Sequence, residues 1–253
     1  IERELRDNGY FVMIRAVRSQ DDLSILMRNW NVDGAIFLYP RLGDRFEDSI
    51  NAIVAETHLP VVLFDARTDN PEVINVCSDD RKGCYLSTRY LINRGHKKIA
   101  FVANYEGNPL LTDRFEGYRA AMEESGLGCD PDCIFSYSPS YEEGIAAGKA
   151  IAASALKITG LVTTADICAI GIMEGARLGG LRIPTDLSVI GYDNLAVSTY
   201  TTPKLTTISQ NVIKKAETAM ELLLEKLRTG HVEQPHIQLD VELVERQSTL
   251  SLL

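Results

Sequence analysis

Residues 159–210 alternate strand-like and helix-like patterns, and this alternation restricts the fold more than any other feature of the chain. One apolar run extends from Leu161 to Thr164, a helix-like segment follows, and a second apolar run extends from Leu187 to Gly191. Asp166 closely follows the first run and Asp193 the second. Short continuous apolar runs suit strands that are covered on both faces. The stretch therefore predicts two parallel strands joined by a helix, and ligands bind at the carboxyl ends of such strands.

The same alternation continues through the rest of the chain. Several helix-like segments end at a glycine, which supplies a left-handed C-cap at little steric cost. Further apolar runs cover residues 10–17, 33–39, 60–65, 73–77, 98–103 and 134–137. This rhythm predicts an α/β fold built on doubly wound parallel sheets.

Composition limits the partners of the chain. Its 253 residues are 45% hydrophobic and 24% charged, which suits one large or two smaller globular domains. The formal net charge is −9, and an acidic surface repels phosphate backbones, so we do not expect this segment by itself to bind nucleic acid. No apolar run approaches the ~20 residues of a membrane span, so we expect no membrane partner.

Patterns typical of metal sites and enzymes are weak. The five cysteines form no regular framework and favour free thiols, and Cys129 and Cys133 have no further ligands nearby in the sequence for a zinc ion. Residues 144–150, GIAAGKA, resemble a phosphate loop only superficially, because the glycines are four apart and no Ser or Thr follows Lys149. We therefore predict no metal, no cofactor and no enzymatic activity.

Polar side chains follow several predicted strands. Carboxylates accept hydrogen bonds from hydroxyl groups, so a group of them suits a sugar-like ligand. The alternative for each is a helix N-cap, which we weigh most heavily for Asp79 and Asp166 because helices follow them; this alternative is weaker for Asp65 and Asp193. The full set is Asp65, Asp79, Asn104, Asp166 and Asp193.

Arg114 lies in the segment TDRFEGYRAAM, which we predict to open a helix. Cations are disfavoured at helix starts, so a ligand or an aspartate across a cleft would explain this placement; the alternative is a solvated arginine. We expect Arg114 to pair with Asp193 when no ligand is bound. We also expect that replacing either residue by alanine leaves the fold intact.

Two helical segments differ in their apolar patterns. The segment from Ile167 to Leu178 is apolar nearly all round, which indicates either a subunit interface or a deeply buried helix. The segment from Asn211 to Arg228 carries a single apolar stripe, with lysines and glutamates opposite.

Longer motifs connect the chain to a known family. They are VDGAIFLYP (32–40), LPVVLFDA (59–66), RGHKKIAFVA (94–103), PTDLSVIGYDN (184–194), PKLTTISQ (203–210) and ELVERQST (242–249). With them, the chain resembles the effector-binding core of the lactose-repressor/galactose-repressor (LacI/GalR) family of bacterial transcription regulators over nearly its whole length.

The resemblance implies a two-lobed periplasmic-binding-protein-like fold, each lobe a doubly wound parallel sheet. The N-terminal lobe would comprise residues 1–76 and 211–237, and the C-terminal lobe residues 77–210 and 238–253. A small-molecule effector would lie between them. Relatives bind operator DNA as homodimers through an N-terminal helix-turn-helix domain, and we expect that domain and the first strand of the N-terminal lobe to be absent from these residues.

The resemblance also selects site residues. Asp65, Arg114, Asp193 and Gln210 match family positions at or near the effector, and Tyr39, Ser78 and Asp166 complete the candidate set. Ala165 replaces the asparagine usual before the position of Asp166, and Ser78 lies where some sugar-binding relatives have a stacking aromatic side chain. These departures leave the particular sugar open.

The function implied is that of a cytoplasmic transcriptional regulator, a repressor that responds to a sugar or related metabolite. A phosphocarrier protein, the effector of some relatives, is a further partner to consider. The alternative is the periplasmic solute-binding protein of a sugar transporter, which uses the same fold. The strings P-x-L-T-T-I-x-Q and L-V-x-R-x-S favour the regulator.

Overall fold

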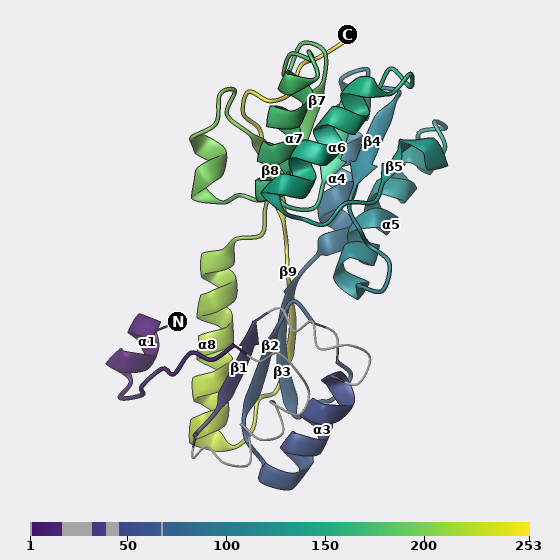
Figure 1. Ribbon diagram of the computed structural model, residues 1–253. Helices are drawn as coiled ribbons and strands as arrows, with labels where there is room; N and C mark the ends of the chain where they lie inside the picture. The colour runs from purple at the N-terminus through teal and green to yellow at the C-terminus, as the bar shows by residue number, and fades with distance from the viewer. Residues whose placement is uncertain (1, 17–31, 39–45, 67) are drawn as a thin grey trace. The chain divides into compact units, whose positions relative to one another are not determined.

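The computed structural model describes residues 2–16, 32–38, 46–66 and 68–253, and the chain forms two compact units (Figure 1). Unit 1 comprises Ile1–Ser78 and Asn211–Leu239, and unit 2 comprises Asp79–Gln210 and Asp240–Leu253. The boundaries expected at residues 76 and 237 fall inside two paired strands, β3 (Val73–Ser78) and β9 (His236–Leu239). Because these strands pair as far as Ser78 and Leu239, the units divide after those residues.

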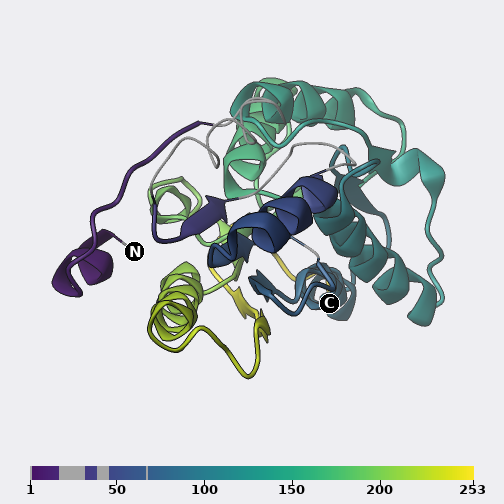
Figure 2. The same ribbon diagram turned by 90° about the horizontal axis from the view of Figure 1, so that it is seen from below.

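Unit 1 contains a four-stranded parallel sheet in the order β1-β2-β3-β9, with β1 at Ala35–Leu38 and β2 at Val61–Phe64. Alternate residues of β2 point to opposite faces, as strand geometry requires. α3 (Phe46–Thr57) covers the face that holds Val61 and Leu63, and α8 (Val212–Thr229) covers the face that holds Val62 and Phe64 (Figure 2). The short α1 (Glu2–Asp7) contributes Leu5 to a small cluster with Met220 and Leu224 of α8.

The strand expected over residues 10–17 is not formed in its described part. Residues 10–16 have neither helix nor strand structure, and Phe11 is 98% exposed. An extended segment becomes a strand only when it hydrogen bonds to a neighbour, and the described strands of unit 1 pair with one another instead. An apolar run alone therefore gave the wrong prediction here.

Unit 2 contains a six-stranded sheet in the order β10-β8-β7-β6-β4-β5. All pairs are parallel except β10 with β8, which are antiparallel at the edge of the sheet. The strands are β4 (Ile99–Val102), β5 (Ile134–Phe135), β6 (Gly160–Thr163), β7 (Ser188–Asp193), β8 (Thr206–Ser209) and β10 (Glu242–Val244). The α/β class with parallel sheets is thus confirmed.

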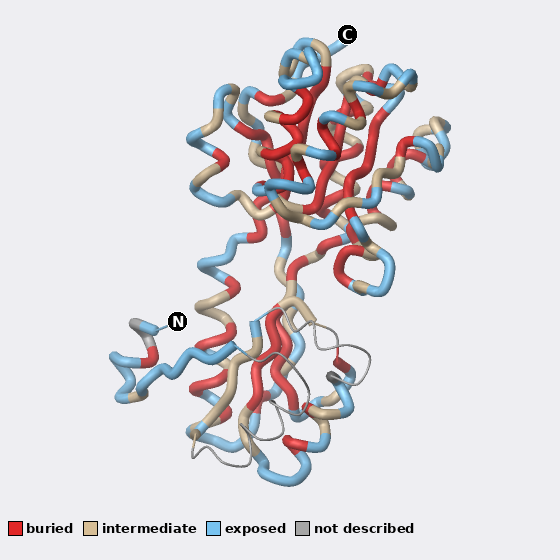
Figure 3. The backbone as a smooth tube through the Cα atoms, viewed as in Figure 1, coloured by how far each residue is buried: buried red, intermediate tan, exposed pale blue. Residues whose placement is uncertain are grey.

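Two pairs of helices cover the faces of this sheet, and Figure 3 shows its central strands β4, β6, β7 and β8 as largely buried. α4 (Asp80–Asn93) and α5 (Pro109–Glu124) pack on the face that holds Phe101, Ile190 and Tyr192. α6 (Tyr141–Ala153) and α7 (Asp166–Leu178) pack on the face that holds Leu161 and Val189. Short 3-10 turns lie at Pro131–Cys133 (η1) and Ala196–Thr199 (η2).

The packing of α7 explains why the predicted segment from Ile167 to Leu178 is apolar nearly all round. One side of it covers the sheet and another lies against α6, where the backbones approach closely through glycines of both helices (Figure 1). A Cβ atom on Gly144 would lie 2.4 Å from the Cys168 carbonyl oxygen, and one on Gly175 would lie 2.1 Å from that of Ile145. Most of α7 is thus buried within unit 2, whereas Ile167 and Leu178 are 38% and 56% exposed, so the subunit-interface interpretation stays a prediction.

Candidate functional site

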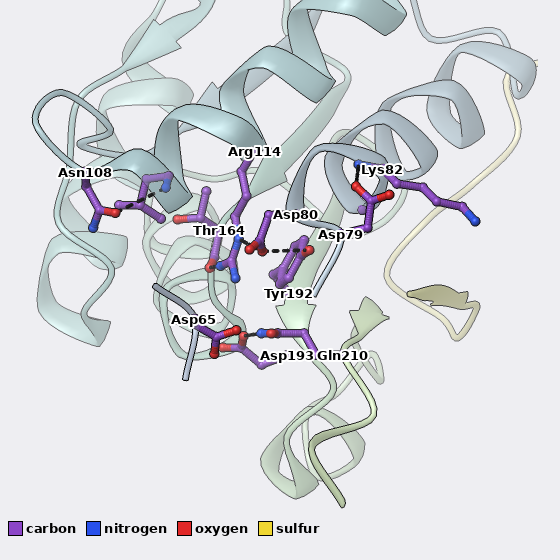
Figure 4. A network of polar contacts seen from close by, with 12 residues as sticks. Asp65, Asp79, Asp80, Lys82, Asn108, Arg114, Thr164, Tyr192, Asp193 and Gln210 are labelled. Carbon is purple, nitrogen blue, oxygen red and sulfur yellow. Dashed lines mark hydrogen bonds and ion pairs between the residues drawn. The ribbon is translucent and has the colours of Figure 1, made fainter. Parts of the chain in front are cut away.

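Polar side chains from four elements converge near the carboxyl end of the unit 2 sheet (Figure 4). They are Asp80 from α4, Arg114 from α5, Tyr192 and Asp193 from β7, and Gln210, which follows β8. This is the edge at which parallel sheets bind ligands. We take these five residues as the candidate site of unit 2.

Arg114 lies in the second turn of α5 and not at its start, so that prediction was wrong. The helix begins at Pro109, and the Asn108 side chain caps it by accepting a hydrogen bond from the backbone N–H of Leu111 at 3.4 Å. An asparagine N-cap followed by proline at the first helical position is a strong start signal. The dipole at the helix start therefore does not account for the placement of Arg114.

A buried ion pair accounts for it instead. Arg114 Nε donates to Asp80 Oδ1 at 2.8 Å, and its Nη1 donates to the Thr164 carbonyl oxygen at 2.6 Å. The side chains of Arg114 and Asp80 are only 6% and 7% exposed. Burial by itself lowers the pKa of the Arg114 guanidinium, but the electrostatic interactions with Asp80, Tyr192, Asp193 and Cys84 together outweigh burial and hold that pKa above its ordinary value. Arg114 thus stays charged and is largely neutralised by Asp80, a partner that the sequence analysis did not select.

Tyr192 completes this buried group. Its ring lies under the Arg114 guanidinium, with 3.7 Å from Cζ to the ring centroid, and its hydroxyl donates to Asp80 Oδ1 at 3.1 Å. Burial raises the pKa of the Tyr192 hydroxyl, which keeps it protonated as a donor. A Cβ atom on Gly83 would lie 2.3 Å from this hydroxyl oxygen, so only glycine at that position lets the ring reach Asp80.

Asp193 and Gln210 form the second half of the site. Gln210 Nε2 donates to Asp193 Oδ1 at 2.5 Å, which joins the ends of two neighbouring strands. Asp193 has a φ of 107° and Asn194 a φ of 55°, so the chain turns sharply directly after β7. The structure thus brings two sequence-predicted residues into direct contact.

The two aspartates considered as helix caps differ in their roles. Asp79 caps α4 by accepting from the backbone N–H of Lys82 at 2.9 Å, as the N-cap alternative predicts. Asp166 does not cap α7, because the N-cap position belongs to Ala165. Asp166 is 0% exposed, and its carboxylate accepts from the Leu195 N–H at 2.7 Å and from the Thr207 hydroxyl at 2.5 Å. A carboxylate without exposed surface does not reach a ligand, so its role must be indirect.

The closing motif L-V-x-R-x-S has a structural explanation. Arg246 donates to the Asn194 side-chain oxygen at 2.5 Å, to Ser198 Oγ at 3.0 Å and to the Leu205 carbonyl at 2.7 Å. Ser248 Oγ accepts from the Thr206 N–H at 2.8 Å and donates to the Val189 carbonyl at 2.6 Å. The motif therefore connects β7, β8 and the turn between them.

Replacing Ser248 by alanine should destabilise unit 2 by about 2 kcal/mol, because the buried N–H of Thr206 and carbonyl of Val189 each lose a partner. Urea unfolding followed by circular dichroism measures the change. Thr249→Ala, next to it in the same segment, is the matched control and should change the free energy of unfolding by less than about 1 kcal/mol. Equal effects of the two substitutions would contradict this assignment.

Unit 1 holds the remaining predicted residues. Asp65 follows β2 with a φ of 51°, and its Oδ1 accepts from Lys215 Nζ of α8 at 2.5 Å. Lys215 has a side chain only 3% exposed, although the stripe pattern placed the lysines of α8 on its solvent side. Ser78 is the buried last residue of β3, and Tyr39 lies outside the described residues.

Comparisons with known proteins identify the family. A family model described as a periplasmic binding protein-like domain matches residues 88–249. The transcriptional repressor PurR of Pasteurella multocida is 32% identical over 234 residues, which cover 92% of this chain and 69% of that protein. The chain belongs to the LacI/GalR family of transcription regulators. The regulator RegA of Clostridium saccharobutylicum is 34% identical over 221 residues, covering 87% of this chain and 65% of that protein.

A solved structure agrees with this assignment. The LacI-family regulator from Enterococcus faecium, which was solved with bound ribose, superposes with a TM-score of 0.87 at 28% identity, over 100% of this chain and 92% of that one. The matched proteins are transcription regulators rather than enzymes or transport proteins, so the transporter alternative is not favoured. Within the described residues, no helix has the length and apolar character needed to cross a membrane. The LacI/GalR relationship assigns this chain the effector-binding, regulatory role of the family.

Proposed function

We propose that this chain is the effector-binding and dimerisation core of a LacI/GalR-type repressor whose effector is an uncharged, sugar-like molecule rich in hydroxyl groups. Binding of the effector would change the affinity of the complete cytoplasmic protein for operator DNA. The complete protein would bind that DNA through a helix-turn-helix domain, the type of domain that the name of the PurR relative indicates for that protein. Asp193, Gln210 and Arg114 of unit 2 would contact the effector, with Asp65, Ser78 and Tyr39 contributing from unit 1.

The observation that carries this proposal is the set of polar groups at the unit 2 site. The Arg114 cation is matched by Asp80 at 2.8 Å, and Asp193 and Gln210 place a carboxylate and an amide at the ends of neighbouring strands. Hydroxyl groups of an effector can donate to a carboxylate and accept from an amide, so both groups suit a sugar-like ligand.

A solved relative also supports a ligand with hydroxyl groups. The E. faecium relative was solved with ribose, an uncharged sugar.

A thermal-shift screen tests the effector class. D-ribose, D-glucose and cellobiose should include a compound that raises the melting temperature of this chain, because ligands that bind only the folded state stabilise it. Ribose 5-phosphate and glucose 6-phosphate should have no effect at equal concentrations. Stabilisation by a sugar phosphate but not by its parent sugar would refute the proposal of an uncharged effector.

Asp193→Asn should weaken the affinity for the sugar that stabilises the chain by about 5- to 10-fold, because a charge-assisted hydrogen bond becomes a neutral one. Titration calorimetry measures the change. Asp132→Asn removes an exposed carboxylate elsewhere in unit 2 and should leave the affinity unchanged. If both variants bind equally well, Asp193 does not contact the effector.

Dimerisation is tested separately by sedimentation. We expect a homodimer at micromolar concentration, as the family assignment implies. If the chain is monomeric throughout the micromolar range, the dimerisation part of the proposal is wrong.

A further inference from the structure

The turn formed by residues 193–195 needs external support. Asp193 and Asn194 both have positive φ values, 107° and 55°, which residues other than glycine rarely adopt. Such conformations persist only where the surrounding structure enforces them. Because this turn carries Asp193 of the candidate site, whatever enforces it also controls where that carboxylate lies.

Asp166 supports the turn from the start of α7. Its Oδ2 accepts from the Leu195 N–H at 2.7 Å, and its Oδ1 accepts from the hydroxyl of Thr207 in β8 at 2.5 Å. A Cβ atom on Gly191 would lie 2.4 Å from Oδ1, so glycine in β7 provides the space that this carboxylate occupies. Three neighbouring elements thus meet at one buried side chain.

Arg246 supports the same turn from the segment after β10. Its Nη2 donates to the side-chain oxygen of Asn194 at 2.5 Å, and its Nη1 fixes Ser198 and Leu205 beyond the turn. Asp166 therefore hydrogen bonds to the backbone of the turn, whereas Arg246 hydrogen bonds to the side chain of Asn194. Asp166 reaches the backbone immediately after Asp193 and Asn194 through a carboxylate, a group that can gain or lose a charge.

We propose that Asp166 is a positioning residue of the effector site: its carboxylate sets the conformation of the 193–195 turn and, through the Asp193–Gln210 pair, the affinity for an effector that it does not touch. The affinity part rests on the proposed function, whereas the conformational part concerns this chain alone.

The charge on Asp166 provides a specific readout. Burial raises the pKa of its carboxyl group to about 7; the hydrogen bonds from Thr207 and Leu195 and the charge of Arg246 lower it, and the charge of Asp193 raises it. The ionised carboxylate accepts both hydrogen bonds, whereas the protonated group has one oxygen that donates. The turn should therefore be held most firmly above neutral pH, and a pH profile distinguishes this role from simple packing.

Nuclear magnetic resonance without any ligand tests the conformational part. From about pH 5.5 to about pH 8.5, the backbone amide of Leu195 and the side-chain amide of Gln210 should titrate together near pH 7 in the unaltered chain. Both signals should be independent of pH in Asp166→Asn, and Asp132→Asn should behave like the unaltered chain. A Leu195 titration that persists in Asp166→Asn, or a Gln210 signal that never responds, would overturn the proposal.

Titration calorimetry with D-ribose, D-glucose and cellobiose tests the affinity part. The sugar that binds should bind about 10-fold more weakly at pH 5.5 than at pH 8.5, and Asp166→Asn should match the weaker value at both pH values. Parallel pH profiles in the two proteins would overturn the role of Asp166 in affinity. If none of these sugars binds the unaltered chain, the proposed effector class fails, and the resonance experiment still decides whether Asp166 positions the turn.

A second substitution covers the case in which Asp166→Asn does not fold. Thr207→Val keeps the carboxylate but removes one of its two donors, so Leu195 should titrate at a higher pH than in the unaltered chain. An unchanged midpoint in a folded Thr207→Val variant would show that this hydrogen bond does not act on Asp166.

Discussion

Replacing Arg114 by alanine is expected to destabilise unit 2 by about 3–5 kcal/mol, the cost of leaving one member of a buried ion pair without its partner. The Asp80 carboxylate would lose the Arg114 cation, and the carbonyl of Thr164 would lose a donor. Tyr192 would lose the guanidinium that covers its ring. Thermal and urea unfolding measure the loss. The sequence alone predicted that the fold survives this substitution; the burial of Arg114 indicates a large cost instead.

Arg119→Ala is the matched control, because Arg119 lies on the same helix and pairs with Glu116 at the surface. Exposed pairs of this kind contribute little, so the free energy of unfolding should change by less than about 1 kcal/mol. The double variant Arg114→Ala/Asp80→Asn should recover part of the loss, since the stranded carboxylate becomes neutral. A loss in Arg114→Ala no larger than in Arg119→Ala would show that the ion pair is not important for folding.

Gly175→Ala should destabilise unit 2 by about 3 kcal/mol, although alanine is the better helix former by about 1 kcal/mol. The added Cβ atom would lie 2.1 Å from the backbone carbonyl oxygen of Ile145, and backbone atoms cannot move aside as a flexible side chain can. α6 and α7 would have to separate along their contact. The melting temperature in a thermal scan measures the effect.

Glu174→Ala tests whether this loss comes from the contact rather than from any change in α7. Glu174 precedes Gly175 on the same helix and pairs with Arg177 near the surface. Its replacement should alter the free energy of unfolding by less than about 1 kcal/mol. A higher melting temperature for Gly175→Ala would mean that helix propensity outweighs the contact.

The sequence predicted well those strands whose burial can be inferred from a local run of apolar residues. The runs that became β2, β3, β4, β6 and β7 are short and mostly apolar, as is typical of strands covered on both faces. β8 has the sequence TTIS and is fully buried, but it lacks an apolar run because Thr206 and Thr207 bond to neighbouring segments. Because most of its residues are polar, a search for apolar runs does not find this strand.

The site was predicted in part. Asp193 and Gln210 were found because they end strands and match family motifs, and the structure joins them. Asp80 was missed because two aspartates follow β3 and the pattern cannot tell which one caps the helix. Lys215 was missed because an ion pair with Asp65, distant in the sequence, draws it out of solvent.

The close packing of α6 against α7 could have been predicted from the spacing of glycines in the sequence. Gly144 and Gly148 were considered only as an imperfect phosphate loop, although Gly171 and Gly175 repeat the same spacing in the next helix. Small residues four apart lie on one face of a helix. Two such faces on consecutive helices predict a close contact, and the structure shows α6 and α7 side by side and parallel, with Gly144 beside Gly171 and Ala152 beside Gly179.

The division of unit 2 into two stretches has a consequence for its synthesis. Residues 79–210 leave the ribosome well before β10, Arg246 and Ser248, because the whole of α8 and β9 is translated in between. Until those later residues emerge, β8 is an open edge and the turn after β7 lacks the guanidinium that holds Asn194 and Ser198. A nascent chain therefore carries α4, α5, β7 and β8 of the candidate site before the contacts that hold the turn after β7 and cover the edge of β8 can form.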